Sequence, residues 1–263
     1  MDYEIMMNNN LKIGMEAPDF NAISTTGEIS LSSYKGKWVV FFSHPGDFTP
    51  VCTTEIIGFA KADTYFKKIN TELIAISVNP GFEYFDSEFL KKTCDDLGVP
   101  FFEEKYDISK IVFEDRQEQN PCSLCANLRR GILNTVAKRE HCSKIALGHN
   151  LDDVLETFLM NLLFAGSIST FSPVSYMDRS GITLIRPLIY ASEKETKRYI
   201  KKNGKQIMPK VCPMDGHSTR EYVKNLIVTL SIKNPHVKAN IMGAIKRNNI
   251  DGWKDTTQRK QSS

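Results

Sequence analysis

The chain has 263 residues, of which 41% are hydrophobic and 25% charged, and a formal net charge of +3. This composition excludes overall disorder, and the length allows one or two globular domains. No apolar run approaches the roughly 20 residues needed to span a bilayer, and the N-terminus lacks the pattern of a signal peptide. Six cysteines without an export signal favour metal or thiol chemistry over a disulfide framework. We therefore expect a soluble, cytoplasmic protein with no membrane contact, in which Cys94 and Cys142 pack in the interior.

Apolar periodicity predicts strands and helices that alternate along the chain. Residues 20–31 are expected to form a hairpin around a turn at Thr26 and Gly27. Further strands are predicted at 38–42, 73–78, 100–104, 144–147 and 181–188. Helices are predicted at 54–69, 87–97, 123–140 and 151–164, and a basic helix with a Ser192 and Glu195 capping box is predicted to stop at Gly204. This order indicates an α/β fold with a doubly wound, mostly parallel sheet.

A cysteine stands at the start of the helix that follows strand 38–42. Cys52 lies where free backbone N–H groups and the helix dipole favour a thiolate, although an inert buried thiol is the alternative. Pro45, Thr49 and Cys52 match the Pro-x-x-x-Thr-x-x-Cys signature, and about residues 11–78 resemble half of a peroxiredoxin, whose fold is thioredoxin-like. The resemblance implies that Cys52 attacks a peroxide held by Thr49, becomes a sulfenic acid and is restored by a thiol reductant. The arginine with which that family polarises the peroxide has no counterpart here, which argues against turnover.

Three further cysteines can form a chelate. Cys122 and Cys125 form a C-x-x-C turn at the start of a predicted helix, and Cys212 follows in a distant segment. Two thiolates from one turn and a third from elsewhere suit an iron–sulfur cluster with one iron left open, whereas adding His217 completes a tetrahedral zinc site. A C-x-x-C turn can also be incidental, so the residues alone leave these possibilities open.

Acidic residues gather at the start of the helix predicted at 151–164, directly after Gly148 ends a strand. Helical spacing places Asp153, Glu156 and Thr157 on one face. An acidic cluster at the carboxyl edge of a parallel sheet can hold magnesium beside a nucleotide. The predicted magnesium ligands are Asp152 and Asp153, and the predicted cofactor contacts are Gly148, His149, Glu156 and Thr157. The alternative is that the acids cap the helix N-terminus and that His149 is structural.

Several motifs occur in a characteristic order: Pro-Cys-Ser-Leu-Cys-Ala-x-Leu-Arg-Arg-Gly, Gly-His-Asn-Leu-Asp-Asp-Val-Leu-Glu-Thr, Ile-Arg-Pro-Leu and Cys-Pro-Met-Asp-Gly-His. With these motifs, residues 79–253 resemble the tRNA 2-thiocytidine synthetase branch of the PP-loop ATPases. The resemblance implies a [4Fe–4S] cluster on Cys122, Cys125 and Cys212 that delivers sulfur to a cytidine of the tRNA anticodon loop, with ATP and Mg²⁺ as cofactors. It also implies a cysteine desulfurase as sulfur donor and a homodimer. The residues expected to contact tRNA or nucleotide phosphates are Arg129, Arg130 and Arg186.

The chain departs from this family at the ATP site, because the Ser-Gly-Gly-Lys-Asp-Ser loop does not occur in it. The peroxiredoxin-like strand, loop and helix, 38–69, stand in its place. We expect one strand–loop–helix–strand unit to have replaced another of the same topology, so that residues 1–78 and 79–253 share one sheet, followed by a polar tail at 254–263. Loop 44–51 contains two prolines, which donate no N–H, so it is a poor phosphate nest. We expect weak or absent ATP binding.

Three functions remain open on the sequence. The leading prediction is a tRNA-modifying sulfur transferase, impaired by the loss of the PP-loop. The alternatives are a thiol-dependent peroxidase that acts through Cys52, and a non-catalytic fusion remnant that keeps a cluster or a tRNA-binding surface.

Overall fold

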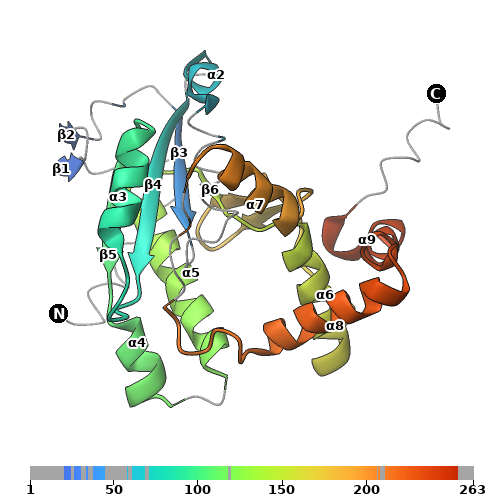
Figure 1. The fold of residues 1–263 in the computed structure, drawn as a ribbon. Helices are drawn as coiled ribbons and strands as arrows, with labels where there is room; N and C mark the ends of the chain where they lie inside the picture. The colour runs from blue at the N-terminus through green and yellow to red at the C-terminus, as the bar shows by residue number, and fades with distance from the viewer. Residues whose placement is uncertain are drawn as a thin grey trace.

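Six strands form the main sheet of the protein, in the order β5-β4-β3-β6-β8-β7 (Figure 1). The computed structural model describes residues 21–24, 27–30, 34, 38–44, 58, 61–68, 71–117, 120–205, 207 and 211–253. The strands are β3 (Trp38–His44), β4 (Thr71–Asn79), β5 (Phe101–Lys105), β6 (Lys144–Ala146), β7 (Val174–Met177) and β8 (Ile182–Ile185). Neighbouring strands of this sheet run parallel except for β7, which pairs with β8 antiparallel. The predicted mostly parallel α/β sheet is confirmed.

Strand β3 lies in the interior of this sheet, between β4 and β6. Val40 is aligned with Leu73 of β4 on one side and with Lys144 of β6 on the other. The peroxiredoxin-like part supplies β3 and the later part supplies β6, so the prediction of one shared sheet is confirmed. The predicted hairpin is also present, as a separate antiparallel pair of β1 (Asn21–Ser24) and β2 (Gly27–Ser30).

Helices cover both faces of the sheet. Successive side chains of a strand point to opposite faces, and in β4 the residues Ile74 and Ile76 pack in the apolar cluster with α5, while Leu73 and Ala75 pack in the cluster with α3. The two helices are α3 (Ser87–Asp96) and α5 (Pro121–Arg139). Both faces of β4 are therefore buried, as a doubly wound sheet requires.

Three helices pack together beside the sheet, around an apolar cluster of their own (Figure 1). They are α6 (Leu151–Phe164), α8 (Thr219–Lys233) and α9 (Val237–Arg247). Trp253 closes this cluster: it is 1% exposed, and its indole N–H donates to the carbonyl oxygen of Phe171 at 3.0 Å. Helices α8 and α9 thus form a helical layer that packs on α6.

The remaining helical segments are short. They are α2 (Asp63–Lys68), α4 (Ile108–Lys110), the π-helical turn η3 (Ile111–Asp115), α7 (Glu193–Lys202) and the 3-10 turn η4 (Ile250–Gly252). The predicted capping box of α7 is present, since the Glu195 N–H donates to Ser192 Oγ at 3.3 Å and the Ser192 N–H to Glu195 Oε2 at 2.8 Å. In the helix predicted at 54–69, only Gly58 and residues 61–68 lie within the described part of the chain.

Four elements, α4, β7, α8 and α9, were not predicted from the apolar pattern of the sequence. In α8, Val223 and Ile227 are buried while Val228 and Ile232 are exposed, so apolar residues lie on more than one face and blur the helical period.

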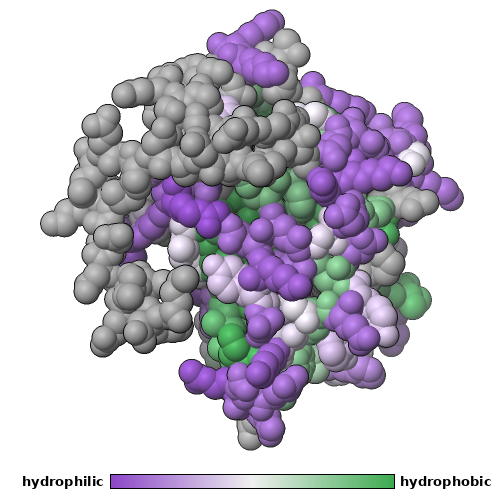
Figure 2. Space-filling model, turned by 90° about the vertical axis from the view of Figure 1, so that its left-hand side faces the viewer, coloured by the Kyte–Doolittle hydropathy of each residue, from purple (hydrophilic) through white to green (hydrophobic). Residues whose placement is uncertain are grey.

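None of the helices in the described ranges has the length and apolarity that crossing a bilayer demands. On the face in Figure 2, the coloured residues are mostly hydrophilic, with smaller apolar patches between them.

Candidate functional site

The start of α6 is held by a reciprocal pair of hydrogen bonds. The Asp153 N–H donates to the side chain of Asn150 at 3.1 Å, and the Asn150 N–H donates to the carboxylate of Asp153 at 2.8 Å. This capping box satisfies backbone groups that have no partner within the helix. For Asp153, the capping alternative of the sequence analysis is therefore confirmed.

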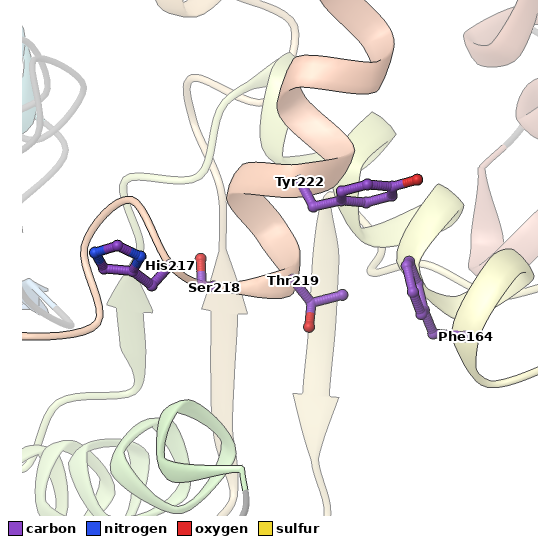
Figure 3. Close-up of a pocket in the computed structure, with 5 residues that line it drawn as sticks. All are labelled: Phe164, His217, Ser218, Thr219 and Tyr222. Atoms are coloured by element: carbon purple, nitrogen blue, oxygen red, sulfur yellow. The ribbon is translucent and has the colours of Figure 1, made fainter.

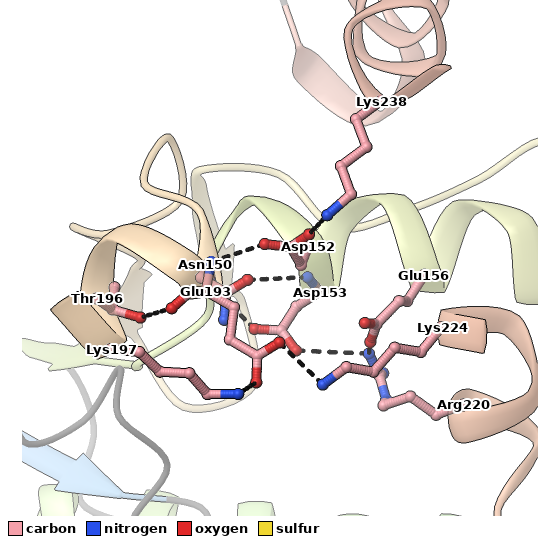
Figure 4. Close-up of polar contacts among 10 residues, drawn as sticks. All are labelled: Asn150, Asp152, Asp153, Glu156, Glu193, Thr196, Lys197, Arg220, Lys224 and Lys238. Carbon is pink, nitrogen blue, oxygen red and sulfur yellow. Dashed lines mark hydrogen bonds and ion pairs between the residues drawn. The ribbon is translucent and has the colours of Figure 1, made fainter. Parts of the chain in front are cut away.

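Asp152 joins three helices. Its carboxylate accepts the backbone N–H of Glu193 at the start of α7, at 2.7 Å, and a hydrogen bond from the Lys238 ammonium of α9 (Figure 4). Both carboxylates predicted to bind magnesium thus have protein partners. Within the described ranges, no group of three or more His, Cys, Asp or Glu side chains is placed to hold a metal ion.

Arg220, in the first turn of α8, reaches across to α6. Its guanidinium lies 3.1 Å from Glu156, 3.6 Å from Asp153 and 3.2 Å from the hydroxyl of Thr157. These contacts confirm that Asp153, Glu156 and Thr157 share a face, and they add a residue that sequence reasoning missed. Because no sequence pattern predicted α8, none placed Arg220 opposite these side chains.

Burial perturbs the two carboxyl groups that Arg220 contacts. Burial raises the pKa of Glu156 to about 7, although the charge of Arg220 acts in the opposite direction. Burial also raises the pKa of Asp153, opposed by its hydrogen bond with Asn150 and by Arg220. Shifted carboxyl groups beside an arginine at a sheet edge are typical of a functional site.

His149 and Arg186 both contact the ring of Phe171. The His149 ring centroid is 4.7 Å from that of Phe171, and the Arg186 guanidinium carbon is 4.9 Å from the same ring centroid. Burial, then Arg186 and Arg220, lower the pKa of His149 to about 3, so the imidazole is neutral. Its Nδ1 is buried and has no hydrogen-bond partner among the described residues.

Arg186 lies in the interior rather than on an open surface. It is 9% exposed, donates to the carbonyl oxygen of Ser172 at 2.6 Å and to the hydroxyl of Ser175 at 3.1 Å, and burial lowers its pKa to about 10. Of the other predicted phosphate contacts, Arg129 is half-buried, while Arg130 is exposed and donates to the Asn127 side chain at 2.7 Å.

Two of the predicted cluster ligands lie close together. Cys122 is in the first turn of α5, after the cap formed by Asn120, and the segment that contains Cys212 passes this end of the helix (Figure 1). Burial and the neighbouring Cys212 raise the pKa of Cys122, and Arg220 acts against them. Cys125 is half-buried one turn further on. Three thiols fit the donor chemistry of an iron–sulfur cluster, but the described chain does not gather them, or His217, into a metal-binding group.

The three other cysteines are Cys94 and Cys142, which were predicted to be buried, and Cys52, which was predicted to react with peroxide. Cys94 and Cys142 are buried, as predicted, and burial raises the pKa of Cys94 to about 12 and that of Cys142 well above its usual range. The predicted peroxide site, Pro45, Thr49 and Cys52, lies outside the described residues.

Two sets of relatives match different parts of the chain. The AhpC/TSA family model matches residues 13–106, which extends past the boundary predicted at residue 78. The tRNA-cytidine(32) 2-sulfurtransferases of Syntrophotalea carbinolica and Citrifermentans bemidjiense are each 34% identical over 180 residues, which cover 67% of this chain and 70% and 71% of those proteins.

A solved structure is also similar to this chain: the U34-tRNA thiolase NcsA from Methanococcus maripaludis with its [4Fe-4S] cluster. It superposes with a TM-score of 0.63 and 26% sequence identity, over 82% of this chain and 73% of that one. The chain therefore belongs to the tRNA-cytidine(32) 2-sulfurtransferase family, and it carries at its front a segment that matches the AhpC/TSA family.

Proposed function

We propose that this protein acts in tRNA thiolation, as a sulfur transferase for a cytidine of the anticodon loop. Membership of the sulfurtransferase family supports the reaction class. In this proposal Cys122, Cys125 and Cys212 hold a [4Fe–4S] cluster, and a cysteine desulfurase supplies the sulfur. When bound, such a cluster supplies an iron with an open position at which sulfur can be carried.

The observation that carries the proposal is the proximity of Cys122 and Cys212, which are 90 positions apart in the sequence. Each thiolate raises the cost of ionising the other, and a shared metal centre removes that cost because it binds thiolates. Arg220 lies near both Cys122 and the acidic face of α6. Its positive charge offsets the negative charge of a thiolate-ligated centre next to the polyanionic RNA.

The cluster is tested by anaerobic purification of the full chain, followed by iron and acid-labile sulfide analysis and visible absorbance. We expect substoichiometric iron in the variants Cys122→Ser, Cys125→Ser and Cys212→Ser, and unchanged iron in Cys94→Ala. Cys94 is a suitable control because it is a buried cysteine at a distance from the proposed ligands in the apolar cluster of α3. A colourless protein that holds zinc would overturn the cluster assignment.

The proposed activity includes an ATP-dependent step, and this chain lacks the loop with which its family binds ATP. The chain has no Ser-Gly-Gly-Lys-Asp-Ser loop, and the carboxylate of Asp152, a predicted magnesium ligand, is already paired with Lys238. We infer weak or absent ATP binding and therefore slow thiolation. Isothermal titration calorimetry measures the affinity directly, and an affinity for ATP in the micromolar range contradicts this inference. Mass spectrometry of tRNA nucleosides measures the thiolated cytidine.

The match of residues 13–106 to the AhpC/TSA family supports a second candidate function, a thiol-dependent peroxidase. In this reaction the Cys52 thiolate attacks one oxygen of a hydroperoxide, the O–O bond breaks, an alcohol or water leaves, and a thiol reductant later reduces the sulfenic acid. A dimedone-type probe, which traps sulfenic acids, tests it after a hydroperoxide is added, because Cys52 must then be labelled much faster than Cys94, whose pKa is about 12. Equal labelling excludes the peroxidase, and failure of both functions leaves a non-catalytic fusion remnant.

A further inference from the structure

A cavity of about 250 Å³ opens between the end of α6 and the start of α8. Its lining consists of Phe164, His217, Ser218, Thr219 and Tyr222. This site is largely open to solvent, so a ligand lies against its wall and is not enclosed by it. None of its lining residues contacts Asp152, Asp153 or Glu156 at the start of α6.

Two exposed aromatic rings form the wall of this cavity. Phe164 is 58% exposed and Tyr222 is 62% exposed, and their ring centroids lie 6.0 Å apart at an interplanar angle of 83°. Figure 3 shows the rings approaching each other from α6 and α8, with Thr219 to one side of them and His217 on the far side of Ser218. Because the rings meet edge to face, they do not cover each other, and a flat ligand can stack against them.

The charge around the cavity is mixed, because Asp215 and Glu221 stand close to its lining residues in the sequence, while Arg220 and the start of α8 are positive. No lining residue is acidic, and residues 157–177, which follow the acidic face of α6, contain no Asp or Glu. Ser218 caps α8 by accepting the backbone N–H of Glu221 at 3.3 Å, so the positive end of a 15-residue helix borders the cavity. In a ligand that carries a phosphate beside a planar ring, the ring can stack on the aromatic wall and the phosphate can lie near the N-terminal end of α8.

The cavity also lies next to the segment of the third cysteine. Two successive turns connect them, since the Asp215 N–H donates to the carbonyl oxygen of Cys212 at 3.0 Å and the His217 N–H to that of Met214 at 3.1 Å. Arg220, between the lining residues Thr219 and Tyr222, lies near Cys122. A group bound in the cavity is therefore held beside the proposed site of sulfur transfer.

We propose that Phe164 and Tyr222 form a stacking pocket for one unpaired nucleobase of the tRNA anticodon loop. This inference rests on the proposed function and adds to it a residue-level contact with the RNA. Sequence-specific recognition of RNA uses unpaired bases that stack on aromatic side chains, and the hydroxyl groups of Ser218 and Thr219 are available to the edge of such a base. The pocket holds the loop so that a neighbouring cytidine faces the cysteines.

The test uses the full chain and an anticodon stem-loop RNA with 2-aminopurine in the loop, at one fixed salt concentration because RNA affinity depends on salt. Fluorescence anisotropy gives the affinity, and quenching of 2-aminopurine reports stacking. We expect Phe164→Leu and Tyr222→Leu each to weaken binding by about 5-fold to 100-fold and to remove the quenching. Phe164→Trp and Tyr222→Phe keep an aromatic ring and are expected to bind as the natural chain does.

Leu163→Ala is the matched control, because Leu163 is 53% exposed at the same helix end and does not line the cavity. Unchanged binding in the leucine variants overturns the stacking pocket while RNA binding, and with it the proposed function, stands. Absence of RNA binding by the natural chain overturns both. If the leucine variants instead lose self-association in sedimentation, with quenching unchanged, the cavity is an interface between copies and the nucleobase proposal is wrong.

Discussion

Replacing Glu156 by glutamine is predicted to stabilise the protein at neutral pH but not at acidic pH. The Glu156 side chain is 6% exposed, and its pKa is raised from 4.5 to about 7. Between these values the folded protein binds more protons than the unfolded chain, so the contribution of Glu156 to stability is greatest below about pH 4.5 and is lost as the pH rises through 7. A pKa difference of about 2.5, at about 1.4 kcal/mol for each pKa unit, corresponds to about 3 kcal/mol.

Urea unfolding followed by circular dichroism at pH 4.5, 5.5, 6.5 and 7.5 measures this effect. Glutamine is nearly isosteric with a protonated glutamate, so the difference in unfolding free energy between Glu156→Gln and the natural chain should be near zero at the lowest pH and about 3 kcal/mol at the highest. A difference that is constant with pH, or a variant that is less stable at pH 7.5, refutes the reasoning. The latter result means that Arg220 stabilises the carboxylate more than burial destabilises it.

Glu193→Gln is a control with the opposite sign. Burial acts to raise the pKa of Glu193, but hydrogen bonds from Lys197 and Lys224 outweigh it and lower the pKa. The stability that Glu193 contributes is therefore present above its unfolded pKa and lost on acidification. Its glutamine variant should fall below the natural chain in stability as the pH rises, whereas Glu156→Gln should rise above it.

Three further predictions concern elements outside the carboxyl cluster. Deleting residues 1–44 removes β3 from the interior of the sheet, and we expect a chain without cooperative unfolding in circular dichroism; a compact, protease-resistant product contradicts this. Trp253→Ala removes a buried ring and its hydrogen bond to Phe171, with an expected cost of about 3–5 kcal/mol in urea unfolding; a cost below about 1 kcal/mol refutes it. Asn150→Ala breaks the capping box with Asp153 and should cost about 1 kcal/mol, while equal stability shows that the cap is dispensable.

Much of the fold was predictable because local patterns agreed with the tertiary structure. The helix predicted at 151–164 has the bounds of α6, since its apolar period and its capping residues indicate the same ends. The shared face of Asp153, Glu156 and Thr157 also follows from helical spacing alone. Strand β4 was predicted from an apolar run that is buried on both faces.

The rest depends on contacts between distant segments, which spacing does not encode. Arg220 meets Glu156 from 64 positions away, and α8 gave no clear helical pattern from which to place it. Arg186 was expected at phosphates from its motif, yet it is buried against Phe171 by the packing of the loop that precedes β7. The proximity of Cys122 and Cys212 was predicted through family resemblance, because no local rule links the start of α5 with the segment before α8.

The interior position of β3 has a consequence for synthesis on the ribosome. Once β4 has emerged and paired, the other edge of β3 stays unpaired until the chain has been made as far as Lys144–Ala146 of β6. The 65 residues that follow Asn79, through Lys144, are therefore translated while this edge of Trp38–His44 is uncovered, and an open strand edge is a template for aggregation. Yield in cells should depend on chaperones that shield nascent chains, more than for a protein whose first strand completes an outer edge.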